Sequence, residues 1–193
     1  YKYKFEYAKE CFANGQYSRA STILQEIIVP LKGSVDAQEC LYMLGMAEYM
    51  NLDYETASET FKKYVKSYPR GQFAEVAQFY IGQSLYMNTP EPRLDQSGTL
   101  AAISAFQEYL DLYPDARYKE QAQQQLFSLQ DKLVDKELYT AQLYYNLGSY
   151  FGNCTSGGNN YEACIVTAQN ALKDFPYTKK REQFASLIMK SKF

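Results

Sequence analysis

Few side chains in this sequence could take part in catalysis, and their types exclude most common reactions. The chain contains no histidine, so it cannot build a Ser-His-Asp or Cys-His nucleophilic site or a histidine-ligated metal centre. Acidic pairs such as Glu55 with Glu59, and Glu108 with Asp111, have the residue type of general acids and bases. Because they recur at helical spacing, we interpret them as solvated helix faces. The sequence therefore predicts no catalytic residue, no metal site and no cofactor.

The glycine-rich stretch at 151–160, FGNCTSGGNN, has the composition of a ligand-binding loop. A phosphate-binding loop requires a Gly-Lys-Ser/Thr ending and opens a helix after a strand, and this stretch does neither. Its Asn-Cys-Thr sequon at 153–155 is a common chance match to a glycosylation site. We interpret the stretch as a polar connection.

The four cysteines form no Cys-x-x-Cys pair and show no zinc spacing. Cys11 and Cys40 fall inside helical patterns and are expected to be small buried residues. Cys154 and Cys164 bracket a short loop and could be joined by a disulfide, which would place the protein outside the cytosol. Four cysteines alone do not decide this question.

Charge and hydropathy exclude two further classes of protein. The net charge is −2 with a pI near 5.3, which does not fit the basic surface of a nucleic-acid-binding protein. No apolar run approaches the roughly 18 residues that a membrane span needs. From 173 to 193, however, six Lys/Arg face two acids. This basic stretch, which includes Lys179, Lys180 and Arg181, is either a solvated helix face or a docking surface for an acidic partner.

A repeated pattern supplies the elements that would carry any site. Residues 53–69, DYETASETFKKYVKSYP, share an alanine, spaced apolar residues and a closing proline with the stretches at 16–30, 99–114 and 159–176. The clearest unit, 38–71, resembles the tetratricopeptide (TPR) repeat, a helix–turn–helix of about 34 residues. In it Gly45 and Ala57 are the small residues where two antiparallel helices approach closely, and Pro69 ends the second helix.

The third repeat carries an insertion, because Gly82 and Ala102 lie 20 residues apart where Gly45 and Ala57 lie 12 apart. The Pro-containing stretch 88–97 is the predicted insertion loop. Beyond it, we predict helices over 117–133, 134–150 and 177–193, together with a helix ending at Pro176. The predicted fold is an all-α, TPR-like helical-hairpin solenoid with about ten helices in about five pairs.

Stacked helix pairs form a superhelix with a concave surface, which suits binding rather than catalysis. We predict two parts: residues 1–116, with three repeats and a substrate groove, and residues 117–193, with the fourth and fifth repeats and a partner-docking surface. From the TPR resemblance, positions 5 and 12 of each first helix face the concave side.

Aromatic residues occupy both of these positions in all three N-terminal repeats. Nine residues, called the predicted groove below, comprise position 5, position 12 and the residue between them: Phe5, Tyr42, Phe79, Phe12, Tyr49, Tyr86, Lys9, Met46 and Gln83. Aromatic rings offer large contact area at little entropic cost, so the groove suits an extended, aromatic-rich polypeptide. The alternative is that some of these rings pack between adjacent helices.

Residues 113–150 are similar to the corresponding stretch of the BamD family, lipoproteins of the outer-membrane β-barrel assembly (BAM) machinery. The shared features are a Tyr-Pro-Asp turn, a long Ala/Leu-patterned helix and an E-x-x-x-A-x-x-Y-Y run followed by G-x-Y: Tyr113, Pro114, Asp115, Ala122, Leu126, Leu129, Glu137, Ala141, Tyr144, Tyr145, Gly148 and Tyr150. The opening YKYKFEYAKECFANGQYSRA and the Leu-Asp-Gln at 94–96 also resemble this family. The loop at 151–160 is longer than the link usual there, which puts in doubt any partner contact at that corner.

The resemblance implies a non-catalytic scaffold that is lipid-anchored at the periplasmic face of the bacterial outer membrane. Its N-terminal repeats would bind unfolded outer-membrane proteins in the predicted groove. Its C-terminal repeats would dock onto BamA through Lys179, Lys180 and Arg181, with other BAM components as further partners. The family's lipidated cysteine would lie upstream, since we expect this chain, which begins at Tyr1, to be a fragment or mature form.

Two other functions remain open. A different periplasmic TPR adaptor, for example one that coordinates cell-wall enzymes, would share the fold, and an upstream lipobox cysteine would favour the BamD family over it. An enzyme with a helical-array accessory domain would carry its catalytic part outside these residues. A reading frame longer by well over a hundred residues would favour this third function.

Overall fold

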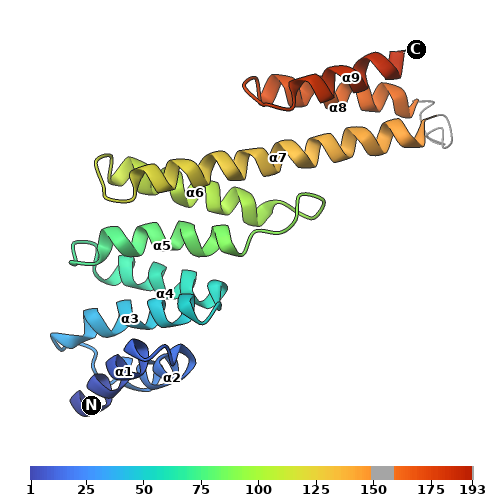
Figure 1. The fold of residues 1–193 in the computed structure, drawn as a ribbon. Coiled ribbons are helices and arrows are strands. Elements are labelled where there is room, and N and C mark those ends of the chain that lie inside the picture. Colours follow the sequence, from blue (N-terminus) through green and yellow to red (C-terminus); the bar gives the residue numbers. More distant parts are fainter. Residues whose placement is uncertain (149–158, 193) are drawn as a thin grey trace. The chain divides into compact units, whose positions relative to one another are not determined.

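The computed structural model describes residues 1–148 and 159–192, and within them every regular element is an α-helix (Figure 1). The prediction of an all-α fold is confirmed. In chain order the helices are α1 (Lys2–Ala13), α2 (Tyr17–Ile28), α3 (Asp36–Met50), α4 (Tyr54–Ser67), α5 (Ala74–Met87), α6 (Ser97–Leu112), α7 (Lys119–Leu147), α8 (Asn160–Asp174) and α9 (Arg181–Lys192). None of them is long and apolar enough to cross a bilayer, as far as the described residues go.

The chain packs as two compact units. Unit 1 consists of Tyr1–Thr89 and Ser97–Leu126, and unit 2 consists of Pro90–Gln96 and Phe127–Phe193. This division concerns packing. The functional division into residues 1–116 and 117–193 stays a prediction.

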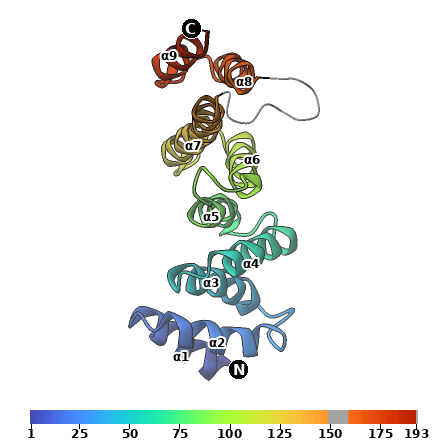
Figure 2. The same cartoon turned by 90° about the vertical axis from the view of Figure 1, so that its right-hand side faces the viewer.

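Unit 1 is a stack of antiparallel helix pairs in which each helix from α1 to α6 packs on the next along the chain (Figures 1 and 2). The small residues Ala8, Ala20, Ala57 and Ala102 are fully buried where paired helices meet. Phe61 of α4 and Phe106 of α6 are also fully buried, and they fill the seams opposite Gly45 and Gly82. Since glycine has no Cβ, the helix backbone approaches the ring closely, as the repeat pattern predicts.

Local signals set the boundaries of these helices. The Asp53 carboxylate accepts a hydrogen bond from the Thr56 N–H (3.4 Å) and caps α4. Gly15, with φ +74°, makes the tight turn between α1 and α2. The connection from α5 to α6 covers residues 88–96, so the predicted insertion loop is confirmed. Cys11 and Cys40 are buried as predicted.

The prediction of separate helices over 117–133 and 134–150 is wrong. Residues 119–147 form one continuous helix, α7, of 29 residues. No glycine or proline interrupts it, so no helix-breaking residue ends the backbone hydrogen bonding between 119 and 147. The described residues consequently form nine helices rather than about ten, with four hairpins and the long α7.

Unit 2 has its own hydrophobic core, built from the second half of α7 and the α8–α9 hairpin. Its buried residues are Val134, Leu138, Ala141, Cys164, Ala168, Ala171, Phe184 and Leu187. The last helix begins at Arg181, four residues after the predicted start, because the turn after Pro176 precedes it.

Candidate functional site

Two of the three position-5 rings of the predicted groove are core residues, and the third, Tyr42, is half-buried. Phe5 is 2% exposed and Phe79 is 1% exposed. The ring of Phe79 stacks on Tyr118 (centroids 4.5 Å apart), and the ring of Tyr42 stacks on Phe73 (4.2 Å). Phe73 and Tyr118 lie just before α5 and α7, so these stacked pairs join one hairpin to the next. Phe5 and Phe79 therefore do not line an open groove.

Two tyrosine hydroxyls accept hydrogen bonds at the same junctions between one hairpin and the next helix. The Tyr64 hydroxyl accepts hydrogen bonds from the Phe73 N–H (3.2 Å) and from Gln38 Nε2 (2.6 Å). In the next hairpin, the Tyr109 hydroxyl accepts from the Tyr118 N–H (3.3 Å). Tyr64 and Tyr109 are both fully buried, and burial raises the pKa of Tyr109 to about 12.

Sequence reasoning did not assign these bonds to Tyr64 and Tyr109. A signal was present, since each tyrosine lies five residues before a closing proline, Pro69 or Pro114. The same reasoning missed Phe73 and Tyr118 as stacking partners. Both lie in turns, and helical periodicity does not predict where the side chain of a turn residue points.

The position-12 rings are only half-buried. Phe12 meets the edge of Tyr17 (5.2 Å) and Tyr49 meets the edge of Tyr54 (5.4 Å), so each packs on the first residue of the following helix. Tyr86, the third member, is half-buried as well. Burial raises the pKa of Tyr49, and a hydrogen bond with Gln83 opposes this shift. The position-12 series and Tyr42 are the aromatic residues of the predicted groove that solvent reaches.

The residues between the two rows have separate surroundings. Lys9 Nζ pairs with Glu39 of α3 (3.0 Å) and with Glu6 (3.6 Å), and it lies 4.3 Å from the centroid of the Phe5 ring. Burial lowers the pKa of Lys9, but the two carboxylates outweigh it and raise this pKa overall. Met46 is half-buried in the core around α3 to α5. Gln83 is buried, and its Oε1 has no hydrogen-bond partner within the described residues.

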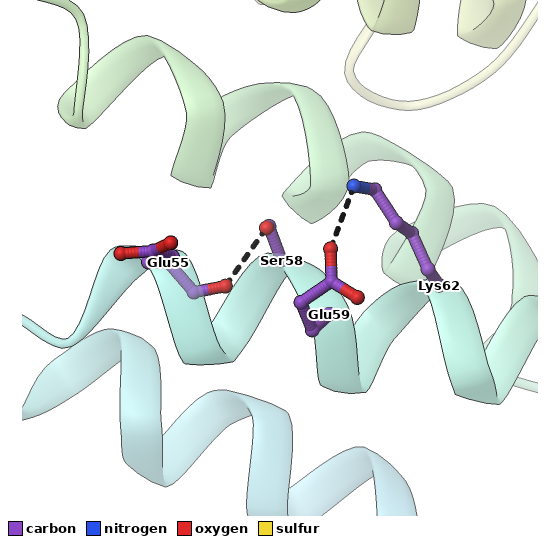
Figure 3. A network of polar contacts seen from close by, with 4 residues as sticks. All are labelled: Glu55, Ser58, Glu59 and Lys62. Carbon is purple, nitrogen blue, oxygen red and sulfur yellow. Dashed lines mark hydrogen bonds and ion pairs between the residues drawn. The ribbon is translucent and has the colours of Figure 1, made fainter. Parts of the chain in front are cut away.

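The carboxylates with general-acid spacing lie on solvated faces, as predicted. All four side chains, Glu55, Glu59, Glu108 and Asp111, are exposed. In α4 the Ser58 hydroxyl donates to the backbone oxygen of Glu55, and Glu59 pairs with Lys62 at 3.0 Å (Figure 3). No group of His, Cys, Asp or Glu within residues 1–148 and 159–192 is arranged to hold a metal ion.

The three basic residues of the predicted docking surface differ in their contacts. Lys180 forms an ion pair and a hydrogen bond with Asp135 of α7, and both side chains are partly buried. Arg181 Nη1 donates to the backbone oxygen of Pro176 (3.3 Å). Lys179 is exposed and lines a hollow of about 490 Å³ between α7 and the turn before α9. Lys180 thus has a carboxylate partner, which Lys179 and Arg181 lack among the described residues.

The predicted disulfide involves one residue outside the described part of the chain. Cys164 is fully buried in the core of unit 2. Cys154 lies outside the described residues, as does most of the loop at 151–160. The pairing of Cys154 with Cys164 stays a prediction.

Comparisons with known proteins give the same fold class and a family. A Podosopora anserina kinesin light chain protein with nearly identical TPR-like repeats has a TM-score of 0.52 at 11% identity, covering 99% of this chain and 92% of that one. A variant of that protein with one substitution has a TM-score of 0.51 at 10% identity, with the same coverage. At these identities the likeness shows the TPR-like fold alone.

Sequence relatives point to one family. The outer membrane protein assembly factor BamD of Caulobacter vibrioides is 24% identical over 135 residues. The aligned region covers 69% of this chain and 44% of that protein, so this chain spans less than half of that relative's length. Residues 2–192 match the family YfiO, outer membrane lipoprotein. Because that match extends over nearly the whole chain, the protein belongs to the YfiO (BamD) family of outer membrane lipoproteins.

Proposed function

We propose that this chain is a non-catalytic scaffold of the BAM machinery, which binds unfolded outer-membrane proteins through unit 1 and docks onto BamA through unit 2. The observation that carries the proposal is the family match over residues 2–192, on a TPR-like array of helical hairpins. A location at the periplasmic face of the outer membrane, held by an upstream lipid anchor, is part of the same proposal.

The half-buried rings of unit 1 support the binding of an unfolded polypeptide. Phe12, Tyr49 and Tyr86 recur on successive first helices, each 37 residues after the last. Tyr17 and Tyr54 hold the first two rings in place by edge contacts. Rings that are already ordered lose little entropy when a ligand packs on them, and they offer large contact area. The proposed substrate surface consists of the solvent-reached part of the predicted groove: Lys9, Phe12, Tyr42, Met46, Tyr49 and Tyr86.

The substrate surface is tested with an unfolded β-barrel protein diluted from urea, whose binding is followed by fluorescence anisotropy. The triple variant Phe12→Ala, Tyr49→Ala, Tyr86→Ala is expected to bind on the order of tenfold more weakly or worse. Tyr113→Ala is the matched control, because it removes a half-buried ring from the turn after α6. Equal affinities for the triple variant and the control would exclude these rings as the substrate surface.

The docking surface in unit 2 is proposed to use Lys179 and Arg181. Both side chains are exposed, whereas Lys180 is paired with Asp135 and would act by positioning the turn. Charge reversal of Lys179 and Arg181 is expected to weaken binding to the periplasmic domains of BamA. Charge reversal of Lys190 and Lys192 in α9 changes the net charge equally, so it is the control. If both double variants bind like the wild type, the docking surface lies elsewhere.

Affinity capture from the native envelope distinguishes the two binding functions. The tagged chain is solubilised in mild detergent, and the proteins recovered with it are identified by mass spectrometry. Near-stoichiometric recovery of a BamA-like barrel protein supports the proposal. Recovery of cell-wall enzymes without such a barrel protein supports the alternative function, a periplasmic TPR adaptor.

A further inference from the structure

We propose that a cationic hollow in unit 2 binds an acidic segment of a partner protein, whose carboxylates pair with Arg93 and Lys136. The hollow has a volume of about 390 Å³ and lies between the α5–α6 connection and one face of α7. Its lining residues are Arg93, Lys136, Tyr139, Thr140, Gln142, Leu143 and Asn146. It shares no residue with the predicted groove or with Lys179 and Arg181, and the inference does not depend on the function proposed above.

The two cations of this hollow have no carboxylate paired with them in the described part of the chain. None of the lining residues that the structure describes is an aspartate or glutamate. Neither Arg93 nor Lys136 has an ion-pair partner among residues 1–148 and 159–192, although the chain has 22 acidic residues and a net charge of −2. The neighbouring carboxylate, Asp135, pairs instead with Lys180. Two like charges at one hollow repel each other, and an incoming carboxylate would remove this repulsion.

Both cations are suited to a carboxylate ligand. The Arg93 guanidinium carbon lies 4.7 Å from the centroid of the Tyr139 ring. A guanidinium held on a ring keeps its edge N–H groups available for paired hydrogen bonds to a carboxylate. Lys136 is half-buried, and its charge is therefore less screened by solvent than that of an exposed lysine.

The neutral residues of the hollow favour a protein segment over a small anion. Gln142 and Asn146 are exposed carboxamides one helical turn apart, which can donate to and accept from a peptide backbone. Tyr139 is 40% exposed and Leu143 is 57% exposed, so apolar surface adjoins the two charges. The volume lies within the range of about 300–1,000 Å³ that is usual for ligand pockets. Carboxylates next to apolar side chains, as in an acidic segment, match this combination.

The test measures the binding of a labelled peptide, acetyl-Glu-Leu-Glu-Glu-Leu-Glu-amide, to the full chain by fluorescence anisotropy. The same peptide with glutamine in place of every glutamate is the ligand control. We expect the acidic peptide to bind, its affinity to fall as NaCl rises, and the glutamine peptide to bind on the order of tenfold more weakly or worse. Equal binding of the two peptides would overturn the proposal.

Two substitutions locate the binding. Arg93→Met and Lys136→Met keep most of each apolar stem and remove the charge, and the double variant is expected to bind the acidic peptide on the order of tenfold more weakly. Lys190→Met removes an exposed lysine of α9 outside the hollow and is expected to leave binding unchanged. Arg93→Lys, which keeps the charge, should retain part of the affinity. A double variant that binds like the wild type would contradict the proposal.

Competition separates a protein ligand from other anions. Inorganic phosphate at the peptide's own concentration is expected not to displace the peptide. Vesicles of phosphatidylglycerol are expected to bind the wild type and the double variant equally. If phosphate displaces the peptide at that concentration, or if vesicle binding requires Arg93 and Lys136, the hollow is a site for small anions or lipid headgroups and the proposal fails.

Discussion

Gly45 of α3 lies directly against the ring of Phe61 in α4. A Cβ added at position 45 would be 2.8 Å from Cε1 of that ring. Gly82 of α5 has the same relationship to Phe106 of α6, with 2.8 Å to Cδ1. Both rings are fully buried. Each of these hairpins is thus closed by a glycine that leaves room for a ring on the partner helix.

Gly45→Ala is expected to destabilise unit 1, although alanine is the better helix former. The gain in helix propensity is about 1 kcal/mol, whereas forcing a methyl group into a packed core costs about 1–3 kcal/mol. We expect the free energy of unfolding to fall by about 1 kcal/mol, measured by urea denaturation. Phe61→Leu should lower the free energy of unfolding less in the Gly45→Ala background than in the wild type. The smaller leucine side chain leaves room for the added methyl group. A more stable Gly45→Ala protein would show that the ring moves aside freely.

Tyr64→Phe and Tyr109→Phe are each expected to destabilise the junction between hairpins. The ring remains, but the Phe73 N–H or the Tyr118 N–H loses its hydrogen-bond acceptor. Leaving a buried donor without a partner costs about 1–3 kcal/mol, which urea denaturation resolves. Tyr68→Phe is the control, since the Tyr68 hydroxyl forms no hydrogen bond within the described residues. Equal effects of the three substitutions would mean that the hydroxyls contribute nothing specific.

The helical hairpins could be predicted from the sequence, and so could the small residues where their helices meet. Each repeat carries the same residue types at equivalent positions. It was harder to predict which aromatic side chains face the core and which face solvent. The sequence places aromatic residues at positions 5 and 12 alike, yet Phe79 is buried and Tyr49 is half-buried. Phe79 packs against Phe106 and Tyr109 of α6, and the ring of the turn residue Tyr118 stacks on it. Contacts made by turn residues of the next hairpin leave no helical periodicity in the sequence.

The continuity of α7 was predictable in principle. Residues 119–147 contain neither a glycine nor a proline that would divide them into two helices. The hollow beside Arg93 was not predictable, because an insertion loop has no register that would place it against a particular face of α7. Gln96 Nε2 shapes the loop locally by donating to the backbone oxygens of Glu91 and Leu94. The position of the loop against α7 depends on tertiary contacts such as that of Arg93 with Tyr139.

Glu48→Gln is expected to stabilise unit 1 at neutral pH. Glu48 is 3% exposed; its Oε1 accepts from Gln25 Nε2 (3.2 Å), while its Oε2 has no hydrogen-bond partner among residues 1–148 and 159–192. Burial raises the pKa of Glu48, hydrogen bonds from Thr60 and Gln25 oppose the shift, the Asp53 charge adds to it, and the Lys63 charge reduces it. Below its unfolded pKa the carboxyl is protonated in both states and imposes no penalty. As pH rises through the raised folded pKa, the buried group ionises and stability falls.

Urea denaturation at acidic and neutral pH tests whether Glu48 makes the protein less stable as pH rises. The wild type should lose stability from Glu48 as pH rises, and Glu48→Gln should remove that loss. Glu59→Gln is the control of opposite sign, because the hydrogen bond and charge of Lys62 lower the pKa of the exposed Glu59 (Figure 3). Its contribution is present above the unfolded pKa and is lost as pH falls through the folded pKa, but screening at the surface keeps it small. A pH dependence unaffected by Glu48→Gln would show that this carboxyl does not titrate on folding.

Lys180→Met is expected to destabilise unit 2, whereas Lys179→Met is not. Lys180 joins the turn before α9 to Asp135 of α7, and both side chains are partly buried. Removing one partner leaves the Asp135 carboxylate uncompensated, at a cost of about 1–2 kcal/mol for a pair that solvent partly reaches. Urea denaturation followed by circular dichroism measures the loss. Asp135→Asn with Lys180→Met should cost less than the sum of the two single changes, since they share one interaction. If the costs simply add, the pair carries no coupling, and Lys180 becomes as available to a partner as Lys179.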